Sequence, residues 1–188
     1  MNSILDSLHR DHKYFAKLLD FLSEQLELVQ NEGIPDFELL LDVVDYIESY
    51  PDLVHHPKED LIFAYFLQHH GGADAVVVES LMEEHRELKG LTASLRSSLE
   101  GILHDAPLQR ESLAQQLSAF LDRQWKHLNA EEASVFPMLD RVMAPNDWDA
   151  IAGDLPDQAD PLFGDDLQQQ YQSLYTRITS AADSLNPA

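Results

Sequence analysis

Apolar residues recur every three or four positions along most of this chain, which places them on one face of an α-helix. The first such stripe consists of Leu5, Leu8, Phe15, Leu19, Leu22, Leu26 and Val29. Similar stripes follow it, and no window shows the apolar–polar alternation that is typical of a strand. The pattern predicts helices at about 3–30, 36–70, 74–103 and 107–143, and a shorter one at about 166–185.

Glycine and proline mark the expected helix ends. Gly33 and Pro35 end the first helix, Gly71 and Gly72 end the second, and Pro107 opens the fourth. Ser3 is the expected N-cap of the first helix. Pro51 and Pro57 lie inside the second stretch, where proline removes a hydrogen bond and crowds the preceding turn. We therefore expect a kink or short break between Tyr50 and Leu53, and a resumed helix with Pro57 in its first turn.

Long amphipathic helices joined by a few residues pack as antiparallel neighbours. The fold class that follows is all-α, an up-down-up-down four-helix bundle over residues 1–145. Residues 146–188 form a C-terminal extension of short helix, Gly- and Pro-rich loop and fifth helix. We expect that fifth helix to pack on the outside of the bundle or to mediate a homodimer.

Composition narrows the possible chemistry. The chain has no cysteine, which excludes disulfides, thiolate metal sites and cysteine nucleophiles. Its formal charge of −22 opposes binding to nucleic acid or to anionic lipid. There is no apolar run of about 18 residues, and the N-terminus lacks the pattern of a signal peptide. We therefore expect a cytoplasmic protein with neither a nucleic acid nor a membrane as partner.

Histidines on the apolar stripes carry the candidate chemistry. One falls in each predicted bundle helix, and two of the four have a carboxylate one turn later, on the same helix face. These residues are His12, His55, Glu59, His85, His127 and Glu131. Burying imidazoles and carboxylates in one layer is costly without a compensating cation. Imidazole and carboxylate converging from four helices therefore predict a non-haem metal centre in the bundle core.

Several neighbouring residues leave alternatives open. His56 is either an additional ligand or an exposed residue at a helix start, and His9 lies one turn before His12 but off the best stripe. Glu131 fits the helical spacing better than Glu132 as the second carboxylate ligand. Two further side chains, Glu48 and Gln124, are candidates to orient ligands through hydrogen bonds.

The ordered motifs resemble those of the hemerythrin-like, His-His-Glu cation-binding domains of bacteria. The resembling segments are residues 8–12, 55–60, 83–85, 127–132 and 135–137. The resemblance implies a four-helix bundle with an oxo- or hydroxo-bridged di-iron centre. It also implies bridging by Glu59 and Glu131, and terminal imidazoles from His12, His55, His85 and His127.

This chain departs from the oxygen-carrying hemerythrins at one position. In those proteins one helix supplies two histidines four residues apart, whereas here His85 is flanked at that spacing by Leu81 and Lys89. The centre is short of one nitrogen ligand, and His56 is the residue that could fill the gap.

The function expected from the resemblance is binding of, or reaction with, O₂, NO or peroxide by an oxygen-, redox- or iron-responsive protein. A ligand-binding protein is favoured over a dedicated enzyme, and no catalytic residue is assigned. Two alternatives stay open: an oxidase or peroxidase that uses the same two irons, and a module whose binding to a partner protein is gated by metal.

Overall fold

The computed structural model describes residues 2–156 and 158–184, and within these ranges it is built from helices and contains no strand. The bundle elements are α1 (Ser3–Gln30), α2 (Phe37–Ser49), η1 (Pro51–His55), α3 (His56–His69), η2 (Gly72–Asp74), α4 (Ala75–Leu103), α5 (Arg110–Ala130), η3 (Glu131–Val135) and α6 (Phe136–Val142). The extension holds α7 (Pro145–Ile151), η4 (Gln169–Tyr171) and α8 (Gln172–Ser184). None of the described helices is long and apolar enough to cross a membrane.

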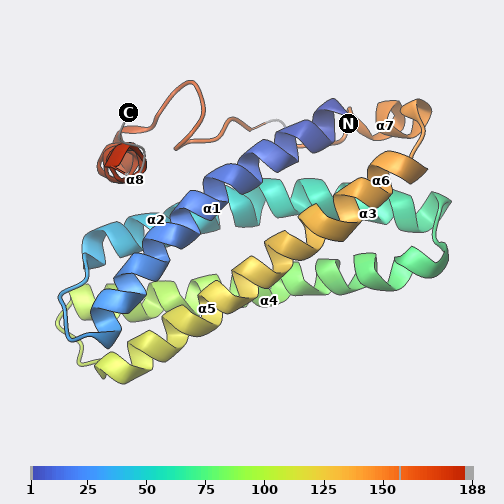
Figure 1. Ribbon diagram of the computed structural model, residues 1–188. Helices are drawn as coiled ribbons and strands as arrows, with labels where there is room; N and C mark the ends of the chain where they lie inside the picture. The colour runs from blue at the N-terminus through green and yellow to red at the C-terminus, as the bar shows by residue number, and fades with distance from the viewer. Residues whose placement is uncertain (1, 157, 185–188) are drawn as a thin grey trace.

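Four rods form the bundle (Figure 1). The elements α2, η1 and α3 make one continuous rod, and α5, η3 and α6 make another. Helix α1 packs on α5, α2 packs on α4, and α4 also packs on α5. The short connections force neighbouring rods to run antiparallel, so the predicted all-α helical bundle is confirmed.

Both composite rods contain a π-helical turn just before a proline. The N–H of His56 bonds to the Pro51 carbonyl, and that of Phe136 bonds to the Glu131 carbonyl, five residues back in each case. The prolines that follow, Pro57 and Pro137, have no N–H and crowd the preceding turn. A wider turn relieves that crowding without ending the helix. The expected kink or break near Tyr50 is therefore a π turn within a continuous rod.

Two apolar clusters fill the bundle, with a polar layer between them. Along α1, Leu5 and Leu8 belong to one cluster, and the residues from Leu18 onward belong to the other. Asp11 and His12, which lie between them, are buried. Among the described buried polar and charged residues, all except Gln25 and Thr92 lie in this layer. The fold thus places the buried polar and charged side chains midway along the four rods.

One expected N-cap and two expected helix starts were wrong. Asn2 caps α1 in place of Ser3, because its Oδ1 accepts a hydrogen bond from the N–H of Ile4. Helix α5 begins at Arg110 rather than at Pro107, since the chain is extended at the Gln109 cap. The last helix begins at Gln172 rather than Asp166.

The segment before α8 is held in a turn that competes with helix formation. The Oδ1 of Asp160 accepts hydrogen bonds from the N–H groups of Leu162 and Phe163. Its Oδ2 accepts one from the Tyr46 hydroxyl of α2. This anchoring ties the extension to the bundle before the chain enters α8. The expected C-terminal end of that helix at Leu185 lies outside the described residues.

The extension packs on the bundle at two separate places (Figure 1). Helix α7 lies near the N-terminus and contacts α3, and α8 packs on α2 and α1. Trp148 of α7 is buried in one apolar cluster, while Leu174 and Ile178 of α8 are buried in the other. The structure thus packs the fifth helix on the bundle, and the division of the chain at residue 145 stays a prediction.

Deleting residues 146–188 is expected to lower stability strongly and to spare metal binding. Leu162, Leu174 and Ile178 would leave the core, and burial of such side chains contributes roughly 1.5–3 kcal/mol each. A loss on the order of 5 kcal/mol follows, whereas every candidate ligand remains in the chain. Thermal unfolding and metal analysis of the truncated protein test both parts. Metal loss from a truncated protein that is still folded would contradict the second part.

Candidate metal centre

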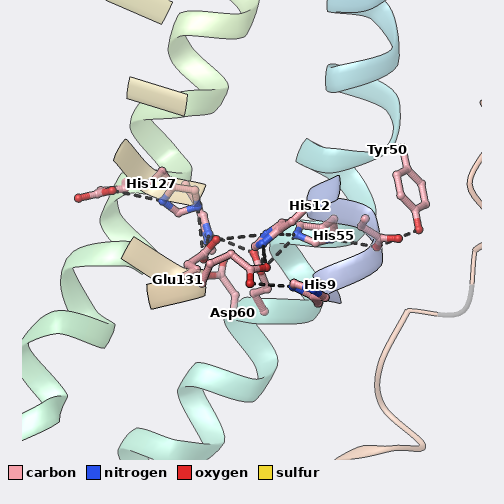
Figure 2. Close-up of polar contacts among 12 residues, drawn as sticks. His9, His12, Tyr50, His55, Asp60, His127 and Glu131 are labelled. Atoms are coloured by element: carbon pink, nitrogen blue, oxygen red, sulfur yellow. Dashed lines mark hydrogen bonds and ion pairs between the residues drawn. The ribbon is translucent and has the colours of Figure 1, made fainter. Parts of the chain in front are cut away.

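Seven buried side chains from all four rods come together midway along the bundle, and Figure 2 shows His12, His55, His127 and Glu131 among them. Each is 6% exposed or less. They are His12 of α1, His55 of η1, His56 and Glu59 of α3, His85 of α4, His127 of α5 and Glu131 of η3. The structure therefore brings together every residue predicted as a ligand from the sequence, and their role as ligands stays a prediction.

These side chains form two groups that share one carboxylate. His12, His55 and Glu59 offer ligand atoms within 4.8 Å of one another. His56, His85 and His127 form the second group at the same spacing, again with Glu59. A carboxylate that belongs to both groups is suited to bridging two cations.

Both central carboxylates face both groups. Glu59 turns Oε1 towards His55 Nε2 at 3.2 Å and Oε2 towards His85 Nε2 at 3.4 Å. Glu131 turns Oε1 towards His127 Nε2 at 3.3 Å and Oε2 towards His12 Nε2 at 3.4 Å. Each oxygen thus serves one group, so the two carboxylates span the gap between two neighbouring cation positions.

The π turn of η1 lets two adjacent histidines serve different groups. Consecutive side chains of a regular helix point about 100° apart. Here His55 Nε2 lies 3.1 Å from His12 Nε2, while the His56 ring stacks on His85 with centroids 4.5 Å apart. His56 is buried, so the alternative of an exposed helix-start residue is wrong.

A ring of outer carboxylates contacts the Nδ1 atoms of the imidazoles. Four of these contacts each join one rod to the next, so that they run once around the bundle. Asp11 of α1 lies 3.0 Å from His55 Nδ1, and Asp60 of α3 lies 2.8 Å from His85 Nδ1. The ring continues with Glu84 of α4 at 3.2 Å from His127 Nδ1 and with Glu132 of η3 at 2.7 Å from His12 Nδ1. Asp52, one turn before His56, lies 3.2 Å from its Nδ1 but forms no hydrogen bond with it. A carboxylate on Nδ1 fixes the tautomer that leaves the Nε2 lone pair free for a metal.

The buried atoms at the centre have the chemistry of a metal site. Both oxygens of Glu59 and of Glu131 and the Nε2 atoms of His85 and His127 are buried without a hydrogen-bond partner. A buried polar group without a partner is costly, and a buried charge is more so. The set contains only imidazole nitrogens and carboxylate oxygens, which are ligands of non-haem iron and similar cations. These residues therefore fit a pair of cations.

Carboxylates raise the pKa of the His12 and His85 imidazoles in the metal-free protein, and likewise that of His55. Burial opposes a charge on His12, but the hydrogen bond that it donates to Glu132 and the nearby Glu59 outweigh this effect and raise its pKa to about 10. Burial also opposes a charge on His85, but Asp60 and the central carboxylates raise its pKa to about 12. His12 and His85 thus hold a proton at neutral pH where a metal would later bind.

His56 behaves differently from these imidazoles. Burial, aided by the neighbouring imidazole of His85, lowers its pKa to about 4 despite the nearby Asp52. It is therefore neutral at physiological pH and needs no deprotonation before it binds a metal.

Metal loading at pH 7 is expected to release the protons held by His12 and His85, because a metal requires their neutral form. Apparent affinity should rise with pH as proton competition fades. The stability of the metal-free protein should instead fall as the pH rises. Its raised imidazole pKa values stabilise it below pH about 6.5, and that contribution is lost as the pH rises through about 10.

Proton release on titration of the metal-free protein with Zn²⁺ in weak buffer measures this effect. The variant His12→Ala should release one proton fewer than the wild type. Equal release by the two proteins would contradict the assignment of a bound proton to His12.

Neither of the two residues expected to orient ligands, Glu48 and Gln124, forms a hydrogen bond with an imidazole. Glu48 pairs with Arg96 on the half-exposed surface between α2 and α4, so its proposed role beside the ligands was wrong. Gln124 lies beside the imidazoles but forms no hydrogen bond with them. His9 pairs with Glu132, 2.7 Å away, outside the two groups. The sequence reasoning missed most of the outer carboxylates, although Asp11, Asp60 and Glu84 each adjoin a predicted ligand.

Comparison with known proteins supports a cation-binding role for this layer. The family model for the hemerythrin HHE cation-binding domain matches residues 3–139, a span that contains all seven central residues. No curated protein and no solved structure matches the chain.

Proposed function

The chain belongs to the hemerythrin HHE cation-binding family, and from this premise we propose that it holds two iron ions and binds a small ligand such as O₂, NO or peroxide. The observation that carries the proposal is the sharing of Glu59 between two groups of buried imidazoles. A single cation would leave one of these groups without a partner.

Iron bound in this layer would supply reversible redox chemistry and a position open to a small ligand. His12, His55, Glu59 and Glu131 would hold one ion. His56, His85 and His127 would hold the other, together with the second oxygen of each carboxylate. The first group has two imidazoles and the second has three. The ion held by His12 and His55 would therefore have one imidazole fewer than its neighbour.

Aromatic side chains shield the imidazoles from water. The ring of Phe136 stacks on His12 with centroids 5.1 Å apart, and that of Phe15 meets His55 edge-on at 4.8 Å. On the other side Phe63 lies 6.1 Å from His85. An apolar surrounding of this kind limits solvent access and favours stable binding of a small ligand.

The position of His56 favours binding over enzymatic turnover. A centre with few imidazole and many carboxylate ligands would favour oxidase or peroxidase activity. Here the His56 ring stacks on His85 and meets His127 at 5.6 Å, so the three-imidazole group is complete. Fast peroxide consumption by the iron-loaded protein would nevertheless favour the enzyme.

Metal analysis with an optical spectrum tests the proposal. Protein produced with ample iron and purified in air is expected to contain about two irons per chain, as its two ligand groups require. It should also absorb in the near ultraviolet, as bridged ferric pairs do. A folded protein with one zinc ion or no metal after the same treatment would overturn the proposal.

A further inference from the structure

A small cavity borders the candidate ligands and is not filled by any side chain. It measures about 20 Å³. By a comparable measure one water molecule needs roughly 10–15 Å³, so the cavity has room only for a very small ligand. It adjoins the polar layer, because three of its lining residues are the candidate ligands His12, His56 and His127.

The remaining lining of this cavity is apolar with one exception. Phe15, Leu18, Leu19, Ile47, Pro51 and Leu128 contribute hydrocarbon surface. The exception is Gln124 of α5, which lies one turn before His127. Among the described residues that line the cavity, Gln124 is thus the only one besides the imidazoles with a hydrogen-bonding side chain.

The amide of Gln124 is a donor without an acceptor. Its Nε2 is buried and has no hydrogen-bond partner in the described part of the chain. An unpaired buried donor destabilises a protein unless something else accepts its hydrogen bond. Neither His12 nor His127 accepts it, since the Nε2 of each faces the central carboxylates, and the donor forms no hydrogen bond with His56 either.

We propose that the Gln124 amide donates a hydrogen bond to the external ligand and thereby selects small ligands that end in a hydrogen-bond acceptor. Azide and hydroperoxide belong to this class. The inference rests on the proposed function, since it requires metal in the adjacent layer. It adds a source of specificity that an apolar pocket lacks, because a site built to donate a hydrogen bond discriminates strongly against ligands that cannot accept one.

Azide titration of the iron-loaded protein tests this role. Gln124→Leu is expected to raise the azide dissociation constant about tenfold, equivalent to about 1.4 kcal/mol, and to speed azide release. Gln124→Met, which keeps the length of the side chain without the donor, should act alike. The matched control is Gln115→Leu, an exposed position on the same helix, which should bind azide as the wild type does.

A second readout does not depend on iron or on activity. In zinc-loaded protein, azide should shift the side-chain amide resonances of Gln124 and leave those of Gln115 unmoved. The thermal stability of Gln124→Leu without ligand should not fall, since the substitution removes an unpaired buried donor. A purely structural role of Gln124 predicts lower stability instead.

The outcomes separate the inference from the proposed function. If wild type and Gln124→Leu hold two irons each and bind azide equally well, the inference is overturned and the proposed function stands. An unmoved Gln124 resonance at saturating azide also overturns the inference. Wild-type protein that takes up no metal overturns the proposed function, and the inference with it.

Discussion

Glu59→Gln is expected to abolish binding of the cation pair, because Glu59 is the carboxylate common to both ligand groups. An amide carries no charge and offers one oxygen, so it can serve only one of the two groups. The chain should retain at most one weakly held ion. A metal at a free concentration about a thousandfold above its dissociation constant stabilises the fold by about 4 kcal/mol. Without that contribution, the melting temperature in the presence of metal should fall by roughly 10 °C.

Metal analysis and thermal unfolding with and without iron measure this effect. Glu83→Gln is a suitable control, because Glu83 is an exposed residue of α4 that pairs only with Arg86 among the described residues. It should keep both ions and the wild-type melting temperature. Two tightly held ions in Glu59→Gln would refute the bridging role.

His56→Ala is expected to weaken the group formed with His85 and His127. The variant should fold, since α3 continues beyond the π turn and Pro57 stays in its first turn. With one imidazole removed, iron should leave faster and the optical spectrum should change. Losses of about 10- to 100-fold in affinity are typical even for residues that only support a ligand.

His9→Ala is the matched control for this substitution. His9 is also a histidine near the centre, but it pairs with Glu132 outside both ligand groups. Its replacement should leave the iron content unchanged. An unchanged spectrum and iron content in His56→Ala would show that His56 is no ligand.

The periodicity of the sequence was sufficient for the fold class and for the order of the motifs. Stripes at spacings of three and four predict amphipathic helices whatever the partner, and short connections leave antiparallel packing as the simple solution. The same local rule put His55 with Glu59, and His127 with Glu131, on shared helix faces. The helical bundle and the family were therefore predictable from the chain alone.

The helical spacing could not predict whether His56 lies inside or outside the core. A regular helix turns adjacent side chains about 100° apart, so the spacing alone left His56 either inside or outside the core. The π turn from Pro51 to His55 widens the helix there and brings both histidines inward. Prolines in the sequence indicated an irregular backbone, but its form depends on how the rod packs against its neighbours.

The outer carboxylates show most clearly the difference between what the sequence determines and what the tertiary structure determines. Asp11, Asp60 and Glu84 each adjoin a candidate ligand in sequence, yet each contacts the imidazole of the next rod. A residue beside an inward-facing ligand points towards the neighbouring rod, so its partner is chosen by packing and not by spacing along the chain. The sequence alone determined which helices carry imidazole and carboxylate. Only the tertiary structure decided which atoms meet, because those contacts join residues 25 or more positions apart.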